Sequence, residues 1–90
     1  MYQIVLANQA KIDYAFFVQT GNQKVLKKIA SLLAELREHP FTGTGKPEPL
    51  KYNLTGCWSR RINSEHRIVY RVNGQTVEVY VLTMRYHYSK

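Results

Sequence analysis

The sequence predicts a single α+β domain spanning residues 1–90, in which a twisted antiparallel β-sheet packs on an N-terminal hairpin of two helices. Three observations predict this architecture. A chain of 90 residues suffices for one domain but not for two. The first half contains apolar residues at helical spacing, and the second half contains alternating runs rich in β-branched and aromatic residues. The expected order of elements is therefore β-α-α-β-β-β.

The chain is expected to open with a strand followed by a helix of about three turns. Residues 2–6 form a short apolar, β-branched run, which is typical of a strand. Asn8 is a suitable N-cap for the following helix. The spacing of Ile12, Ala15 and Phe16 predicts that these side chains form its buried face.

The second helix is the clearest element in the sequence. Gly21 suits the left-handed conformation that ends the first helix, and Asn22 can cap the second. Apolar residues then recur at the spacing of one buried stripe. They are Val25, Ile29, Leu32, Leu33 and Leu36. Pro40 should end this second helix. The short break between the first and second helices makes them an antiparallel hairpin.

A long loop and three strands are predicted for the rest of the chain. Residues 40–56 are rich in glycine and proline, and a loop of this length in a small domain is more often functional than incidental. Strands are predicted at residues 57–62, 66–72 and 76–82. The Asn73-Gly74 pair is typical of a tight hairpin turn between the last two.

Alternate side chains of a strand face opposite sides of the sheet, so the arginines can be assigned to faces. Ile68 and Tyr70 should face the helices, and Arg67 should point away from them. Arg61 falls on the outer face, whereas Arg60 shares the face of the apolar residues two positions on either side. The outer face of the sheet is therefore expected to show arginines to solvent.

Positive charge is concentrated in the second half of the chain. The formal net charge is +7, and residues 46–90 contain eight basic and three acidic residues, which gives +5 for that half. Five of those eight are arginines, the residue that binds phosphate through two parallel hydrogen bonds. A nucleic acid or an acidic protein is therefore a candidate partner, and a basic surface that serves only solubility is the alternative.

Several classes of function lack support in the sequence. The single cysteine, Cys57, excludes a disulfide framework and is more typical of a small buried residue than of a nucleophile. No signal peptide or membrane-spanning run is evident, so a cytoplasmic protein is expected. His39, His66 and His87 are far apart, and no metal-binding motif or carboxylate cluster is present. No metal or cofactor is therefore expected.

Cleavage of RNA without a metal needs fewer groups, because RNA supplies its own nucleophile, the 2′-hydroxyl. A carboxylate or histidine can remove its proton, basic side chains can stabilise the charged phosphate, and a histidine can protonate the leaving oxygen. The candidates are Glu48, Lys51, Arg61, Arg67 and His87. Taken singly, each is more simply a surface or packing residue. Composition and spacing alone support only a basic α+β domain able to bind RNA.

Two stretches give a more specific indication. The string PFTGTGKPEPLKYNLTGCWSRRINSEHRIVYRV over residues 40–72, followed by RYHY at residues 85–88, closely resembles the YoeB (Txe/YoeB) toxins of the RelE-like superfamily. The resemblance is strong over the second half of the chain. The helical hairpin, with LKKIASLLAELREHPF at residues 26–41, matches in layout and partly in sequence. A RelE-like fold is implied.

The resemblance implies a toxin of a type II toxin–antitoxin module that cuts mRNA in the ribosomal A site without a metal. Carried onto this sequence, Glu48 is the expected general base and His87 the expected general acid. Arg67 would stabilise the charged phosphate, and Tyr88 would stack on or position the substrate nucleotide. These four residues form the expected catalytic set.

The resemblance also implies supporting residues and partners. Lys51 and Arg61 would assist at the phosphate, and Glu65 would lie beside them and orient an arginine. The expected partners are a YefM/Axe-type antitoxin with an acidic C-terminal segment, the ribosome with its rRNA, and the mRNA. Operator DNA would be bound through the antitoxin complex, and a homodimer is reported for the family type.

Two departures and one rival hypothesis accompany the resemblance. The chain continues past Tyr88 with Ser89-Lys90, so the tyrosine carries no free carboxylate, and the first helix lacks the tryptophans expected there. The rival is a non-catalytic binder: a toxin fold that poisons another target, as ParE relatives poison gyrase, or one that serves only in operon repression. Such a protein has no reason to carry Glu48, Arg67, His87 and Tyr88 together.

Overall fold

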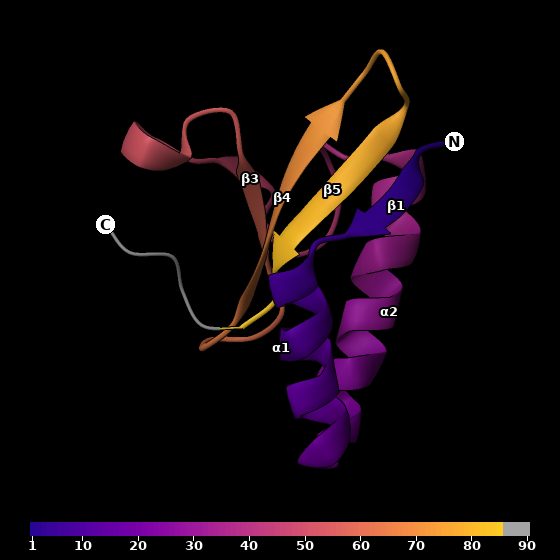
Figure 1. Cartoon of the computed structure of the whole chain (residues 1–90), viewed down its shortest axis with the longest axis vertical. Helices are drawn as coiled ribbons and strands as arrows, with labels where there is room; N and C mark the ends of the chain where they lie inside the picture. The colour runs from indigo at the N-terminus through magenta and orange to yellow at the C-terminus, as the bar shows by residue number, and fades with distance from the viewer. Residues whose placement is uncertain (86–90) are drawn as a thin grey trace.

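The computed structural model describes residues 1–85 and has an α+β fold (Figure 1). Two helices, α1 (Asn8–Gln19) and α2 (Gln23–Glu38), lie side by side on one face of a five-stranded sheet. The strands are β1 (Gln3–Leu6), β2 (Glu48–Pro49), β3 (Trp58–Arg61), β4 (Arg67–Asn73) and β5 (Glu78–Thr83). A short 3-10 helix, η1 (Tyr52–Leu54), follows β2. The predicted α+β class is confirmed.

The sheet is mixed, whereas the sequence predicted an antiparallel one. Its strand order is β1-β5-β4-β3-β2, and β1 runs parallel to β5 while every other neighbouring pair is antiparallel. A parallel pair requires a long crossover between its strands. The helical hairpin and the strands after it form that crossover, which lets β1 and β5 point the same way.

Helix α2 confirms its prediction in nearly every respect. Asn22 Oδ1 accepts a hydrogen bond from the Val25 N–H at 3.2 Å, and Gly21 has φ +66°. Four of the five expected stripe residues are buried, and Leu33 is half-buried. They pack against the inner side chains of the sheet, with Ile68, Tyr70, Val79 and Val81 fully buried.

The predicted buried face of α1 is wrong for Ile12 and Ala15, which are exposed, whereas Phe16 is half-buried and packs against the core. Ala10, Asp13 and Phe17 are buried, whereas Ile12 is 61% exposed. Asp13 decides this orientation, because its carboxylate accepts the Met84 N–H at 2.9 Å in the core beside the end of β5. Apolar residues occur almost all round this helix, so its periodicity alone could not select a face.

Two smaller predictions are also wrong. Asn8 lies inside α1, and the N-cap is Ala7, which makes no side-chain cap hydrogen bond. The β4–β5 connection has four residues, 74–77, in place of a two-residue turn. Asn73 Oδ1 accepts the N–H groups of Gln75 and Thr76, which opens the turn, and Gly74 does not adopt the positive φ that the tight form requires.

No helix within residues 1–85 is long and apolar enough to cross a membrane.

Candidate functional site

The outer face of the sheet, opposite the helices, brings together Glu48, Ser59 and Arg67. Glu48 on β2 is the register partner of Ser59 on β3, and Arg67 opens β4 on the far side of β3. Arg67 Nη1 lies 3.1 Å from Glu48 Oε1 and 3.2 Å from Ser59 Oγ. Three neighbouring strands thus place a carboxylate, a hydroxyl and a guanidinium within direct contact.

Arg67 is buried, whereas the sequence predicted that it would be shown to solvent. It is only 9% exposed, and its Nη1 contacts Ser59 and Glu48 on the outer face. The Glu48 side chain keeps 49% of its surface exposed. A guanidinium stays protonated in proteins, so this arrangement fixes a positive charge beneath an accessible carboxylate. A phosphate bound here would lie next to a cation, Arg67, and a proton acceptor, Glu48.

Ser59 is a member of the site that the sequence reasoning missed. Strand parity placed it on the outer face, but a serine carries no charge to mark it. It is fully buried and its hydroxyl orients the Arg67 guanidinium. The signal that could have found it is its position beside Arg61 on the face that carries the predicted arginines.

Gly45 brings the long loop close enough to β3 to place Glu48. Its carbonyl accepts the Arg61 N–H at 2.7 Å, and its φ is +85°. A Cβ at this position would lie 2.9 Å from the Arg61 carbonyl oxygen. Only glycine fits this approach without displacement of the backbone. Pro47 and Pro49 then stiffen the chain on both sides of Glu48.

Arg60 holds the start of the same loop from the inner side of the sheet. Its side chain is fully buried, as its shared face with apolar residues predicted. Nη1 lies 2.9 Å from Glu35 Oε1 and donates to the Thr44 carbonyl at 3.3 Å. Nη2 donates to the carbonyls of His39 and Thr42. One guanidinium therefore binds the backbone carbonyls at the start of the loop that leads into β2.

Two further groups complete this buried network. Tyr70 accepts a hydrogen bond from Arg60 Nε at 3.4 Å and donates to the Pro40 carbonyl at 2.6 Å. Burial raises the pKa of the Tyr70 phenol, which keeps it a neutral donor. The Thr44 N–H donates to Glu35 Oε1 at 2.7 Å, and hydrogen bonds from Thr44 and then Arg60 lower the pKa of the Glu35 carboxyl.

The remaining predicted residues lie around this centre. Arg61 is exposed and is the register partner of Arg67 across β3 and β4. Lys51 is exposed just beyond β2, where it is the N-cap of η1. Glu65 is exposed in the β3–β4 turn, and its Oε1 lies 3.6 Å from His66 Nε2. His87 and Tyr88 lie outside the described residues.

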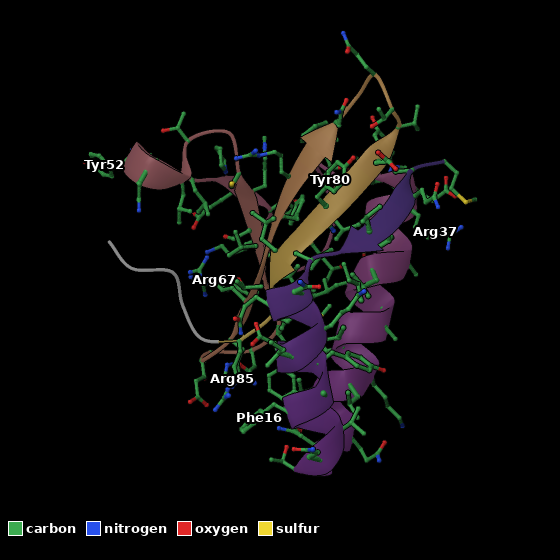
Figure 2. The ribbon with its side chains drawn as sticks, viewed as in Figure 1. Phe16, Arg37, Tyr52, Arg67, Tyr80 and Arg85 are labelled. Atoms are coloured by element: carbon green, nitrogen blue, oxygen red, sulfur yellow. The ribbon has the colours of Figure 1, made fainter. Side chains whose placement is uncertain are left out.

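The described chain ends at Arg85 and is anchored on α1. Arg85 stacks on Phe16 of α1, with its guanidinium carbon 3.3 Å from the ring centroid (Figure 2). The Met84 N–H is held by Asp13, as described above. These two contacts fix the point from which the segment with His87 and Tyr88 departs. The sequence did not predict these two contacts, because the only sign of them was a single aspartate, Asp13, among the apolar residues of the first helix.

Within residues 1–85, no group of three or more histidine, cysteine, aspartate or glutamate side chains could hold a metal ion. The chemistry available at the described part of the site is that of a carboxylate, a hydroxyl and a guanidinium.

Residues 6–88 match the family model of the YoeB-like toxins of bacterial type II toxin–antitoxin systems. Among curated proteins, Toxin YoeB of Synechocystis is 47% identical over 78 residues, which cover 87% of both chains.

Solved structures agree with this match. A YoeB/ParE toxin from Agrobacterium tumefaciens has a TM-score of 0.88 at 42% identity, covering 96% of this chain and 99% of that one. A YoeB–YefM complex from Staphylococcus aureus has a TM-score of 0.82 at 44% identity, covering 98% and 99%. A YoeB dimer from the same organism gives 0.82 at 44% identity, covering 97% and 98%.

Proposed function

Because the chain belongs to the YoeB-like toxins of bacterial type II toxin–antitoxin systems, we propose that it inhibits translation as a metal-independent endoribonuclease that cuts mRNA in the ribosomal A site. The observation that carries this proposal is the contact of Glu48 with Arg67 at 3.1 Å on an accessible face of the sheet. A carboxylate that can take a proton, next to a fixed cation, suits attack by a 2′-hydroxyl on the adjacent phosphate.

The proposed reaction is a transphosphorylation within the RNA. Glu48 removes the proton of the 2′-hydroxyl as the 2′ oxygen forms a bond to phosphorus. Arg67, oriented by Ser59, stabilises the additional negative charge of the phosphorane. His87 donates a proton to the 5′ oxygen as its bond to phosphorus breaks. The products are a 2′,3′-cyclic phosphate and a 5′-hydroxyl, and no water or metal is consumed.

The other expected residues have supporting roles in this proposal. Arg61 neighbours Arg67 across the β3–β4 pair, so it can add positive charge near the phosphate. Lys51 follows β2 at the edge of the same face. Tyr88 would stack on the nucleotide beside the scissile bond. Glu65 would act on the neighbouring histidine, His66, since that is its contact in the described structure.

An antitoxin and the ribosome are the proposed partners. The related Staphylococcus aureus toxin was solved with YefM and as a dimer. A YefM-type antitoxin with an acidic segment would complement the net charge of +7. It would mask the site, and the complex would bind operator DNA. The dimer is proposed for this chain on the same ground, and the cytoplasm is where such a ribosomal target would be met.

Primer extension on a translated mRNA with purified ribosomes tests the proposal. The wild type should produce breaks within ribosome-bound message and none on the same RNA alone. Glu48→Ala combined with His87→Ala should abolish them, while Lys11→Ala, on the exposed side of α1, should not. Cleavage by the double variant at the wild-type rate would overturn the mechanism.

A further inference from the structure

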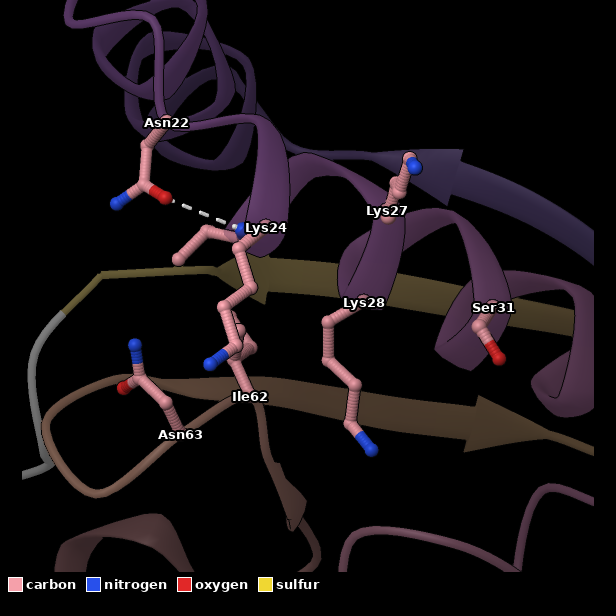
Figure 3. Close-up of a pocket in the computed structure, with 8 residues that line it drawn as sticks. Asn22, Lys24, Lys27, Lys28, Ser31, Ile62 and Asn63 are labelled. Atoms are coloured by element: carbon pink, nitrogen blue, oxygen red, sulfur yellow. Dashed lines mark hydrogen bonds between the residues drawn. The ribbon is translucent and has the colours of Figure 1, made fainter.

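A groove of about 700 Å³ runs between the first half of α2 and the β3–β4 turn (Figure 3). Val25 and Ile62, which are 4% and 6% exposed, form its apolar floor. Lys24, Lys27 and Lys28 line it from α2, and Asn63 lines it from the turn. We call this feature the α2 groove. It lies on the helical side of the sheet, away from the Glu48–Arg67 contact.

The charge of the α2 groove has one sign. No carboxylate lines it. Within the part of the chain that the structure describes, none of the three lysines takes part in an ion pair. Lysine stems can cover an apolar floor while their ammonium groups remain in water. Lys24 and Lys28 extend toward the β3–β4 turn, whereas the ammonium group of Lys27 points away from Ile62 and Asn63 (Figure 3).

These lysines stand where the helix itself does not favour them. Lys24 occupies the first turn of α2, where the helix dipole favours negative charge, and that turn contains no acidic residue. Lys24 with Lys27 and Lys24 with Lys28 are like-charged pairs at i, i+3 and i, i+4, which destabilise a helix. No ion pair within residues 1–85 compensates these charges, and departures from local preference of this kind are expected at functional sites.

The α2 groove and the candidate site meet in the sequence at the end of β3. Ile62 lines the groove and directly follows Arg61, which is exposed beside Arg67 on the outer face. Consecutive Cα atoms are about 3.8 Å apart, so Arg61 and the groove are neighbours along the backbone at this end of β3. Consecutive side chains of a strand face opposite sides of the sheet, so the groove and the candidate site lie on different faces.

We propose that the α2 groove is a docking surface for the phosphate backbone of an RNA strand, at which Lys24 and Lys28 contact phosphates. Lysine binds phosphate as a point charge, and such contacts give affinity without reading sequence. An acidic peptide is the other polyanion of suitable charge. RNA is favoured because the proposed substrate of the candidate site is itself an RNA. The inference therefore rests on the proposed function.

The test measures binding of a fluorescent single-stranded oligoribonucleotide at several salt concentrations, without ribosomes. Lys24→Gln/Lys28→Gln should lower affinity and reduce the slope of log K against log salt by about 1.4, since each phosphate contact contributes about 0.7. Between about 50 and about 200 mM salt, the wild type should lose about sevenfold more affinity than the variant. Glutamine keeps a similar helix propensity, so the fold should persist.

The matched control is Lys11→Gln/Arg37→Gln, which removes two exposed charges outside the groove and the site. Equal slopes for the two double variants would overturn the proposal. The proposal would also be overturned if Lys24→Gln/Lys28→Gln lost affinity for polyglutamate but not for RNA, because the groove would then bind an acidic protein segment. The wild-type protein could cut no mRNA on ribosomes while Lys24→Gln/Lys28→Gln still binds RNA more weakly than the wild type. In that case the proposed function is wrong, and the inference about the groove stands.

Discussion

At the scale of single residues, the fixed charge of Arg67 is the central element. Its Nη1 contacts both Ser59 Oγ and Glu48 Oε1. A lysine would keep the positive charge as a point charge but would lose the planar guanidinium. We expect Arg67→Lys to lower single-turnover cleavage on ribosomes by about 10²–10³-fold, the usual effect of losing one transition-state donor.

The same variant should change ribosome binding little, because its charge is retained. Arg37→Lys, on the opposite side of the molecule from Arg67 (Figure 2), serves as its control and should cleave normally. A wild-type rate for Arg67→Lys would show that the guanidinium geometry is not used.

Glu35 should make stability depend on pH in acid. Its pKa is lowered below the ordinary 4.5 by hydrogen bonds from Thr44 and Arg60. A carboxyl whose folded pKa is depressed stabilises the protein above its unfolded pKa, and that contribution is lost as pH falls through the folded pKa. Urea unfolding should therefore show stability falling below about pH 4.5, and Glu35→Gln should flatten that fall.

Glu38→Gln, an exposed acid on the same helix, provides the comparison for this measurement. An equal flattening by both variants would mean that the Arg60 network does not set the acid dependence.

At the scale of elements, the contact between α1 and the end of β5 links the fold to the segment that carries His87. Asp13 accepts hydrogen bonds from the Met84 N–H and from Gln9 Nε2, both at 2.9 Å. Asp13→Asn keeps the shape but sets an amide donor against one of these two donors. We expect a loss of about 1–3 kcal/mol in the free energy of unfolding.

Chemical denaturation measures this loss, and cleavage should fall as well if the anchor positions the following segment. Gln19→Ala at the exposed end of α1 should stay within about 0.5 kcal/mol of the wild type. A similar value for Asp13→Asn would mean that the buried carboxylate is not a tether.

The elements also show how far sequence reasoning reaches. Helix α2 was predictable because one stripe, one cap and one stop signal agree. The orientation of α1 was not, since it depends on a hydrogen bond between Asp13 and a residue 71 positions away. The open β4–β5 turn was missed for a local reason: the Asn73 side chain competes for the N–H groups of the turn.

Gly45 gives a direct test of how the loop places Glu48. Gly45→Ala combines a positive φ of +85° with a contact of 2.9 Å to the Arg61 carbonyl. We expect cleavage to fall more than stability, because the loop can retreat from β3 and take Glu48 with it. Gly74→Ala, which meets no atom within 4 Å and has no positive φ, should retain wild-type cleavage. Full activity of Gly45→Ala would contradict this account of the loop.

At the scale of the whole molecule, the two faces of the sheet carry different sets of contacts. The inner face packs on the helices and holds the Arg60 network, and the outer face carries the Glu48–Arg67 contact. The sequence predicted the members of that contact from the family strings and from strand parity. It did not predict the burial of Arg67, nor that β2 pairs with β3 and sets Glu48 opposite Ser59.

The chemical ends of the cleaved mRNA test the central claim most directly. Attack by the 2′-hydroxyl, with Glu48 as base and Arg67 at the phosphate, must leave a 2′,3′-cyclic phosphate on one fragment and a 5′-hydroxyl on the other. End-group analysis of fragments made on ribosomes by the wild-type protein should find these ends. Fragments with a 3′-hydroxyl and a 5′-phosphate would contradict the account, because they require attack by water.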